Sequence, residues 1–553
     1  MIKQIKLESG DVIITQKDVV GHLTGWIESL YKASKGLNRW GILSALILDT
    51  NKKIHFAGGY FTPKSGMPLS YGMGEQYLGQ YPGTRQVDVF PMYCAIISKE
   101  VVEKVGIPEN LGSDIFTDAD YCLEVEKAGF KLYATDKLTV IYQGGPKNQE
   151  EIMQYSNMFL KGSQTFSQKW GGLIKSHYKY PVLYVAKAGG ASGFARASRG
   201  YMHGLIDNGV DVSFEPLDST IDSVRPSEDE VCNSLLEGRG DMLMPQIVWG
   251  QAPWFIKNSG IYKIGHCEFE ADEAPESWIP YCNMMDEIWV PTEWDKKKFK
   301  KAGVQVPIYV IYQGIDPNYF HPDYAPMQVD SKETFKFVAN GAWFPRKNLR
   351  NLAVAFQSEF KRGEDVCLII KTMDLGLNDG IENEIKKIPE SANSANVYIK
   401  EALLPDCEMP SLYTMADCFV LPTRGEGWGL PFFEALACGI PVIATGYSAP
   451  NEMLRDKKGK PYGGVHFIDY SPAKSSSKYV YLEGKTWAEP KMQHMKKLMR
   501  EVYNNRAIEK KKALKTSKII RKRFSWTACS KQVKDRIVDI YKNKLVAKNG
   551  GMK

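Results

Sequence analysis

The chain has 553 residues, of which 43% are hydrophobic and 24% charged, and its formal net charge is +7. This composition is ordinary for a globular protein of roughly three to four domains, and the charge is too small to indicate nucleic-acid binding. It suits an acidic ligand such as a diphosphate, or a weak attraction to an anionic membrane surface. The ten cysteines form no Cys-x-x-Cys pair, which favours reduced, buried thiols over disulfides or a zinc site.

Short apolar strands alternate with amphipathic helices along much of the chain, a pattern typical of parallel sheets covered by helices. We expect an α/β segment at 1–145, a polar helical connector at 146–176, α/β domains at 177–307 and 308–475, and a helical tail at 476–553 that packs back on them. No apolar run approaches the roughly 18 residues of a membrane span, and the first residues open no signal-peptide pattern. We therefore expect a cytoplasmic protein, free or loosely peripheral to a membrane.

The first segment has a strand-like run at Ala95–Ser98 and a helix-like run at Asp120–Ala128, and the run Phe116-Thr117-Asp118-Ala119-Asp120 leads into that helix. It resembles the C-terminal half of family 2 glycosyltransferases, which have the GT-A fold, and Asp118 falls where that family keeps its catalytic carboxylate. Two positions depart from the resemblance: Ser9 replaces the first acid of the metal-binding Asp-x-Asp segment, and Gln143 replaces the closing histidine. No nucleotide-binding half precedes these residues, so we predict a catalytically silent segment that serves packing, oligomerisation or acceptor docking. A partner chain that completes it is the alternative.

Three further sequence patterns lie between the first segment and residue 348. A glycine-rich turn with Gly190 and Gly193 lies between the strand Pro181–Ala186 and a helix, as phosphate cradles do. A segment at 264–278 follows a later strand of the same domain and is rich in polar residues. A basic turn at 344–348 then follows the strand Phe335–Ala339 and opens a helix.

The strand Cys418–Pro422 leads into a glycine-rich loop and then a short helix, which Pro431 starts and Gly439 ends. The loop's backbone N–H groups and the helix N-terminus favour an anion. Glu426 and Glu434 bracket this segment, and carboxylates are natural acceptors for pairs of sugar hydroxyls. The two can therefore hold a sugar and a ribose on either side of a phosphate-binding loop. The alternative is that both glutamates merely favour a helix start.

The run Glu426-Gly427-Trp428-Gly429-Leu430-Pro431, followed by Glu434, resembles the signature of glycosyltransferase family 4, which has the GT-B architecture. In that family the first glutamate faces the donor sugar and the second holds the nucleotide ribose. The resemblance extends from about Pro181 to Tyr541. It implies two doubly wound Rossmann-like domains and transfer of a hexose-like sugar with retention at the anomeric carbon, with no metal or other cofactor.

The resemblance also implies roles for the basic turn. Lys347 matches the family lysine that neutralises the donor diphosphate, where a cation stabilises the charge that develops on the leaving group. The family often has an arginine about five residues earlier, but that position is Ala342, and we expect Arg346 to replace it. A solvated basic turn is the alternative. Lys371, at the end of the next strand, is a further candidate contact.

On the opposite wall, the turn with Gly190 and Gly193 resembles the family's first loop, which lies over the donor diphosphate. Glu270, which precedes a proline and a tryptophan, resembles an acidic residue of the family. His266 is the counterpart of a family histidine near the reacting sugar, or else a structural histidine.

Together these patterns predict a retaining hexosyltransferase that takes a UDP- or GDP-sugar and a glycan, lipid-linked or protein acceptor. The expected catalytic residues are Glu426, Lys347, Arg346, His266 and Glu270, and the expected donor-binding residues are Glu434, Gly193, Gly190, Gly427, Trp428, Gly429, Leu430 and Lys371. Peripheral membrane contact and a homo-oligomer formed through the N-terminal segment stay open. The main alternative is a non-catalytic nucleotide-sugar or glycan-binding protein that keeps the fold, and a second is another GT-B enzyme such as a phosphorylase or epimerase.

Overall fold

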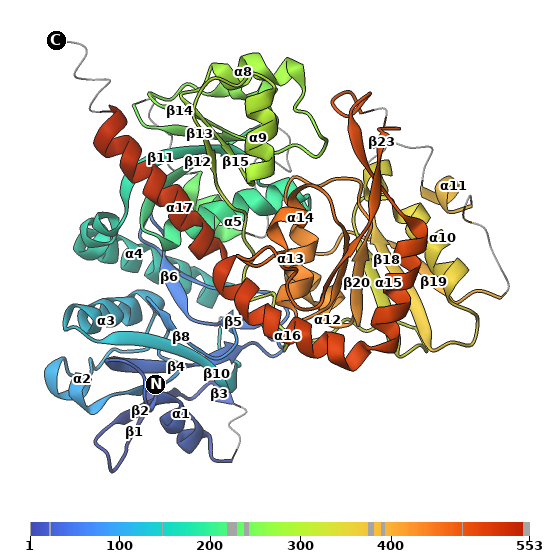
Figure 1. Cartoon of the computed structure of the whole chain (residues 1–553). Helices are drawn as coiled ribbons and strands as arrows, with labels where there is room; N and C mark the ends of the chain where they lie inside the picture. The colour runs from blue at the N-terminus through green and yellow to red at the C-terminus, as the bar shows by residue number, and fades with distance from the viewer. Residues whose placement is uncertain are drawn as a thin grey trace, which may run out of the picture. The chain divides into compact units, whose positions relative to one another are not determined.

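A computed structural model describes residues 2–20, 24–145, 148–217, 229–236, 243–373, 381–386, 388, 393–477 and 479–545. The chain forms two compact units, Met1–Lys179 (unit 1) and Tyr180–Lys553 (unit 2) (Figure 1). Among the described residues, none of the helices combines the length and the apolar character that crossing a bilayer requires.

Unit 1 is built on a mixed eight-stranded sheet of order β1-β2-β9-β4-β10-β3, with β5 paired to β4 and β8 to β10. Its long central strand β4 is apolar and buried along almost its whole length, and it runs parallel to β10. The strands are β1 (Ile2–Lys6), β2 (Val12–Gln16), β3 (Val19–Val20), β4 (Trp40–Leu48), β5 (Ile54–Phe56), β6 (Gly59–Phe61), β7 (Pro68–Ser70), β8 (Thr84–Val87), β9 (Cys94–Ile97) and β10 (Lys131–Tyr142). The helices are α1 (Trp26–Ser34), α2 (Lys99–Lys104), α3 (Ile115–Lys127) and α4 (Gln149–His177).

Helix α4 covers most of the segment that the sequence suggested as a connector. It belongs to unit 1 and contacts α3, and its C-terminal half buries Trp170 and Ile174 in the core of that unit. Its N-terminal part leaves several apolar side chains exposed, Met153 among them. The second half of the segment expected as a connector is therefore a helix that packs on unit 1.

Asp118 lies in α3 and is buried, and its two carboxylate oxygens accept the backbone N–H groups of Met92 at 2.8 Å and Gly112 at 2.6 Å. Burial raises the pKa of Asp118 to about 7. The Asp118 carboxylate, which matches a catalytic position by sequence, thus binds the backbone of two loops to α3. The absence of catalysis in this segment stays a prediction.

Unit 2 contains two six-stranded sheets. The first, which we call the N-sheet, has the order β12-β11-β13-β14-β15-β16, and β11 and β13 to β16 run parallel. Its strands are β11 (Lys179–Ala186), β12 (Val210–Pro216), β13 (Gln246–Trp249), β14 (Lys263–His266), β15 (Glu287–Val290) and β16 (Ile308–Val310). The helices around it are α5 (Gly193–Asp207), α7 (Glu230–Leu235), η1 (Ala252–Lys257), η2 (Glu276–Trp278), α8 (Ile279–Asn283) and α9 (Glu293–Lys301).

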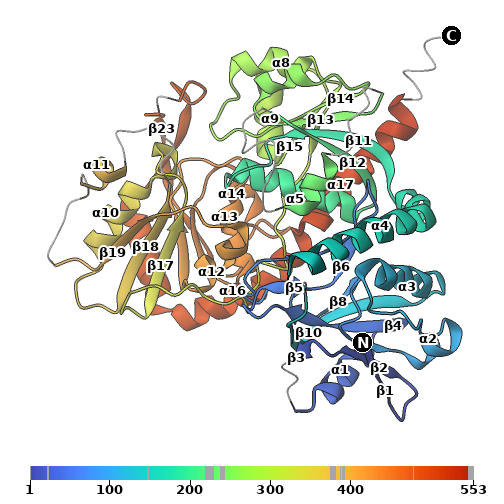
Figure 2. The same cartoon turned by 180° about the vertical axis from the view of Figure 1, so that it is seen from behind.

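The second, the C-sheet, has the order β19-β18-β17-β20-β21-β22 with every pairing parallel, and Figure 2 shows β17, β18 and β19 as neighbouring arrows. Its strands are β17 (Phe335–Asn340), β18 (Val366–Thr372), β19 (Val397–Glu401), β20 (Cys418–Leu421), β21 (Val442–Thr445) and β22 (Val465–Ile468). The helices are η3 (Pro345–Lys347), α10 (Leu349–Glu359), α11 (Ile381–Lys386), η4 (Asp406–Glu408), α12 (Met409–Thr414), α13 (Leu430–Ala437) and α14 (Ser448–Met453). The predicted pair of Rossmann-like domains, preceded by a further α/β segment, is confirmed.

The tail links the two sheets (Figure 1): α16 packs on α13 beside the C-sheet, and α17 packs on α5 beside the N-sheet. A Cβ atom at Gly200 of α5 would lie 2.0 Å from the ring of Trp526 of α17, so these helices meet closely only because glycine stands there. One cluster of buried apolar side chains runs through both sheets and α17. The tail elements are β23 (Tyr470–Lys474), β24 (Thr486–Pro490), α15 (Met492–Asn504), α16 (Arg506–Arg523), α17 (Trp526–Asp539) and η5 (Ile540–Lys544).

Candidate functional site

The basic turn and the glycine-rich loop emerge at the same edge of the C-sheet. The turn follows β17 and the loop follows β20, and these strands are parallel neighbours. Their carboxyl ends therefore meet, which is where such sheets bind ligands. The backbone N–H of Arg424 donates to the carbonyl of Arg346 at 2.7 Å and fixes the loop against the turn.

Glu426 is the centre of a buried ion cluster on this edge. Its Oε1 lies 2.7 Å from Nζ of Lys347, and its Oε2 lies 3.0 Å from a guanidinium nitrogen of Arg346. Burial alone would raise the pKa of Glu426, but the two adjacent cations lower it to about 2. Burial lowers the pKa of Lys347, and the charge of Glu426 opposes this effect. The sequence-predicted residues Glu426, Arg346 and Lys347 are thus brought together as charged partners.

The polar segment after β14 reaches this cluster from the N-sheet. Glu270 lies 3.1 Å from the guanidinium of Arg346. Glu268, which the sequence did not single out, accepts a hydrogen bond from Gln313 at 2.6 Å. Burial and then the negative charge of Glu270 raise the pKa of Glu268 to about 8, so Glu268 is largely protonated at neutral pH.

Glycine residues allow the loop after β20 to lie close to the segment after β14. A Cβ atom added to Gly425 would lie 2.1 Å from the backbone oxygen of Glu270, and one added to Gly427 would lie 2.6 Å from the carboxyl carbon of Glu268. Contacts this short are impossible for any other residue without a shift of the backbone or side chain. The glycines of the loop therefore allow the segment after β14 of the N-sheet and the loop after β20 of the C-sheet to be in contact.

Glu434 occupies the other end of the loop, in α13. It is buried, and its Oε2 accepts the hydroxyl of Tyr413 at 2.6 Å. Its Oε1 lies 2.5 Å from a guanidinium nitrogen of Arg196, which comes from α5 beside the N-sheet and also lies 3.3 Å from Asp406. Sequence reasoning missed Arg196, although it closes the glycine-rich segment after β11.

Four other predicted donor contacts lie in β18, in the glycine-rich loop and at the start of α13. Lys371 is the last residue but one of β18 and is buried, and burial and then the charge of Arg196 lower its pKa. Trp428 is buried and stacks on Phe433 with the ring centroids 4.8 Å apart. Gly429, with φ of +94°, precedes Leu430, the first residue of α13.

The glycine-rich turn after β11 lies at the start of α5. Gly193 begins α5, and Ser192 caps this end by accepting the N–H of Ala195. The carbonyl of Gly190 accepts a guanidinium N–H of Arg199 at 3.1 Å. A Cβ atom at either glycine would meet none of the described atoms within 4 Å.

His266 does not join the ion cluster in this structure. It is buried among aromatic rings, with centroid distances of 4.2 Å to Trp249, 5.0 Å to Tyr201 and 5.8 Å to Trp289. Neither ring nitrogen has a hydrogen-bond partner among the described residues. Burial lowers the pKa of His266 to about 3, so the ring is neutral at physiological pH. A packing role accounts for this environment, and its expected place near the reacting sugar stays a prediction.

Residues 327–515 match the family described as Glycosyl transferases group 1. This match covers the C-sheet, the ion cluster and part of the tail. The chain is 30% identical over 116 residues to O-antigen chain mannosyltransferase B of Escherichia coli, which is 21% of this chain and 30% of that protein. It is 31% identical over 121 residues to alpha-monoglucosyldiacylglycerol synthase of Streptococcus pneumoniae (strain ATCC BAA-255 / R6), or 22% and 26% of the two chains. The chain thus spans less than a third of either relative.

Among solved structures, sucrose-phosphate synthase from Thermosynechococcus elongatus aligns with a TM-score of 0.48 and 14% sequence identity, over 66% of this chain and 99% of that one. The structure called WaaG, a glycosyltransferase involved in lipopolysaccharide biosynthesis, aligns with a TM-score of 0.42 and 13% identity, over 65% and 99%.

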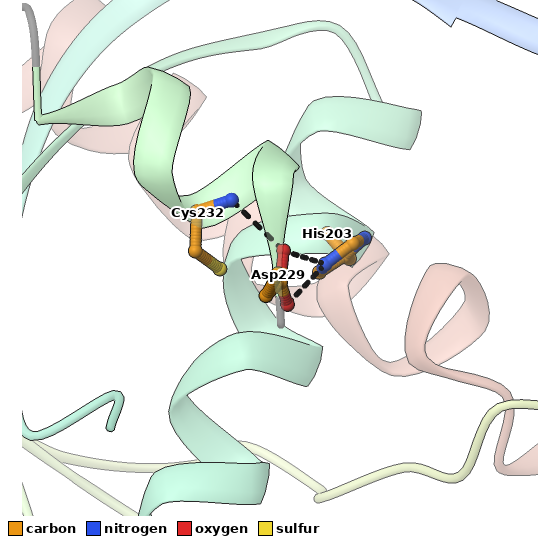
Figure 3. Close-up of side chains that lie close together, drawn as sticks. All are labelled: His203, Asp229 and Cys232. Carbon is orange, nitrogen blue, oxygen red and sulfur yellow. Dashed lines mark hydrogen bonds and ion pairs between the residues drawn. The ribbon is translucent and has the colours of Figure 1, made fainter. Parts of the chain in front are cut away.

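A second cluster of titratable groups lies beside the N-sheet (Figure 3). His203 of α5 lies 2.8 Å from Asp229, which also caps α7 by accepting the N–H of Cys232 at 2.9 Å. These three side chains are the one group of potential metal ligands within 4.8 Å of one another among the described residues. Asp229 raises the pKa of His203 to about 9 against the effect of burial, and His203 likewise lowers that of Asp229 to about 2. An ion pair and a helix cap account for this arrangement.

Proposed function

We propose that this protein is a retaining glycosyltransferase of the family 4 type. It takes a hexose-like sugar from a UDP- or GDP-sugar and passes it to a glycan, lipid-linked or protein acceptor. The match of residues 327–515 to a family of glycosyl transferases, and the mannosyltransferase name of one aligned relative, support glycosyl transfer as the general reaction.

One observation carries the proposal: two buried glutamates and two cations converge where β17 and β20 end. Glu426 lies against Arg346 and Lys347, and Glu434 lies in the helix that follows the same loop. A nucleotide-diphosphate sugar offers hydroxyl pairs at both ends and negative charge in the middle. Carboxylates suit the hydroxyls and cations suit the diphosphate, so the arrangement is complementary to such a donor.

The chemistry follows from these charges. The bond between the anomeric carbon and the diphosphate oxygen breaks, and a bond from that carbon to the acceptor oxygen forms on the same face. The proton of the acceptor hydroxyl passes to the leaving diphosphate oxygen. Charge grows on the leaving diphosphate as the bond breaks, and fixed cations stabilise this charge without reorganisation. Arg346 and Lys347 supply that stabilisation, so we propose that no metal or other cofactor is required.

A non-catalytic nucleotide-sugar-binding protein is the second candidate, and one observation favours it. Ala342 stands where the family resemblance expects an arginine, which removes one cation from the leaving-group site. Release of free nucleotide separates the two candidates, since a binding protein holds the donor intact.

The test is a panel of UDP- and GDP-sugars, scored by thermal shift and by release of UDP or GDP. A donor that binds the folded state raises the melting temperature by mass action, and we expect slow hydrolysis of that donor in the absence of acceptor. Glu434→Gln should weaken its binding by about tenfold to a hundredfold, because an ionised acceptor of hydroxyl protons is lost. Binding without any turnover would favour the second candidate, and no binding by any of these sugars would contradict both.

A further inference from the structure

Arg196 connects the two sheets of unit 2 through the donor-side glutamate. It stands in the first turns of α5, beside the N-sheet, whereas both of its partners, Glu434 and Asp406, belong to the C-sheet side. Its side chain is 13% exposed, and Glu434 is 2% exposed. A cation held this far from water needs an anionic partner, because an unpaired buried charge is strongly destabilising.

Three cations at the candidate donor site are held by carboxylates. Arg346 and Lys347 are paired with Glu426, and Arg196 is paired with Glu434. A nucleotide-diphosphate sugar supplies partners for the glutamates and for the cations at once. Its hydroxyls are able to replace the cations on the glutamates, and its diphosphate is able to replace the glutamates on the cations.

Two features direct Arg196 toward a diphosphate. The positive charge of Arg196 contributes to lowering the pKa of Lys371, so the two cations are near enough to interact, and an anion between them would stabilise both. Arg196 also follows the glycine-rich turn and the Ser192-capped start of α5, a helix of 15 residues whose N-terminal N–H groups favour a phosphate. The planar guanidinium suits two oxygens of a phosphate at once.

We infer, on the basis of the proposed function, that Arg196 is a diphosphate-binding residue of the donor site. Arg196 pairs with Glu434 in the structure; when the donor binds, the ribose hydroxyls take its place there and the guanidinium moves to the diphosphate. Arg196 thereby supplies from the N-sheet side the cation that the C-sheet side lacks at Ala342. Donor binding then requires both sheets, and the Arg196–Glu434 pair holds them together in its absence.

The experiment measures the affinities of UDP, GDP, uridine and guanosine by calorimetry for the wild type, Arg196→Ala and Arg196→Ala/Ala342→Arg. We expect Arg196→Ala to weaken binding of the preferred diphosphate by about tenfold to a hundredfold, as for a lost charged hydrogen bond. Binding of the matching nucleoside should stay equal or tighten, since Glu434 is freed for the ribose. Ala342→Arg in the same chain should restore most of the diphosphate affinity.

Arg500→Ala is the matched control, because Arg500 is also an arginine held by two carboxylates, Glu359 and Glu364, away from the site. It should lower the melting temperature without changing either affinity. Should Arg196→Ala not fold, Arg196→Lys replaces it and should lose part of the diphosphate affinity alone. Equal losses of diphosphate and nucleoside would show a purely structural clasp, and unchanged diphosphate binding would also overturn the inference. If the wild type binds none of the four ligands, the proposed function fails together with it.

Discussion

Glu426→Gln is expected to lower the rate of sugar transfer by about a hundredfold to a thousandfold, and to destabilise the protein by about 3 kcal/mol. Stability falls because the substitution removes the negative charge that holds two buried cations, Arg346 and Lys347. The rate falls because the carboxylate proposed to face the donor sugar loses its charge. The amide keeps the size of the side chain, so packing is preserved. The measurements are kcat with the preferred donor and the free energy of unfolding in urea.

The control combines Glu426→Gln with Lys347→Met, which removes one of the two cations left without a partner. If the charge pair is the cause, the double variant regains part of the lost stability, because contacting residues are not additive. Its activity should stay low, since Lys347 is needed for the leaving diphosphate. Full transfer activity in Glu426→Gln would contradict the role assigned to this carboxylate.

Arg536→Ala is expected to cost about 3–5 kcal/mol of stability, because it leaves a fully buried carboxylate without a countercharge. Glu287, which is 0% exposed, accepts hydrogen bonds from Tyr262 at 2.8 Å, from Trp289 at 2.7 Å and from Arg536 of α17 at 2.5–3.1 Å. This network ties the tail helix to the N-sheet. The measurement is urea unfolding followed by far-UV circular dichroism.

Lys531→Ala provides the matched control on the same helix, because Lys531 is an exposed cation and such side chains contribute less than about 0.5 kcal/mol. Arg536→Ala/Glu287→Gln should be more stable than Arg536→Ala, since the neutral amide no longer carries a buried charge. A loss below about 1 kcal/mol in Arg536→Ala would mean that the tail is not held by this network.

The four inner strands of the C-sheet, β18, β17, β20 and β21, could be predicted closely from the sequence because they are buried on both faces. Parallel sheets covered by helices need nearly continuous apolar runs, and the run that became β20 is such a stretch. Pro431 and Gly439 likewise predicted the ends of α13, since Pro431 is among its first residues and Gly439 has φ of +73° just beyond it. These features depend on local backbone chemistry alone.

The partners that come from more distant parts of the chain could not be predicted in the same way. Arg196 and Glu434 are 238 residues apart, and Arg536 and Glu287 are 249 apart. The same holds for His266, whose aromatic surroundings come from three other elements. Neither the periodicity nor the motifs of one sequence predict which side chains of distant elements come into contact.

The central claim, that an activated sugar binds where β17 and β20 end, is tested most directly by a crystal structure with the nucleotide diphosphate that binds best. The account predicts diphosphate oxygens about 3 Å from Nζ of Lys347, with the ribose hydroxyls on Glu434. A nucleotide held elsewhere, such as in the cavity of about 310 Å³ beside Tyr309 and Arg536, with Lys347 still on Glu426, would contradict it.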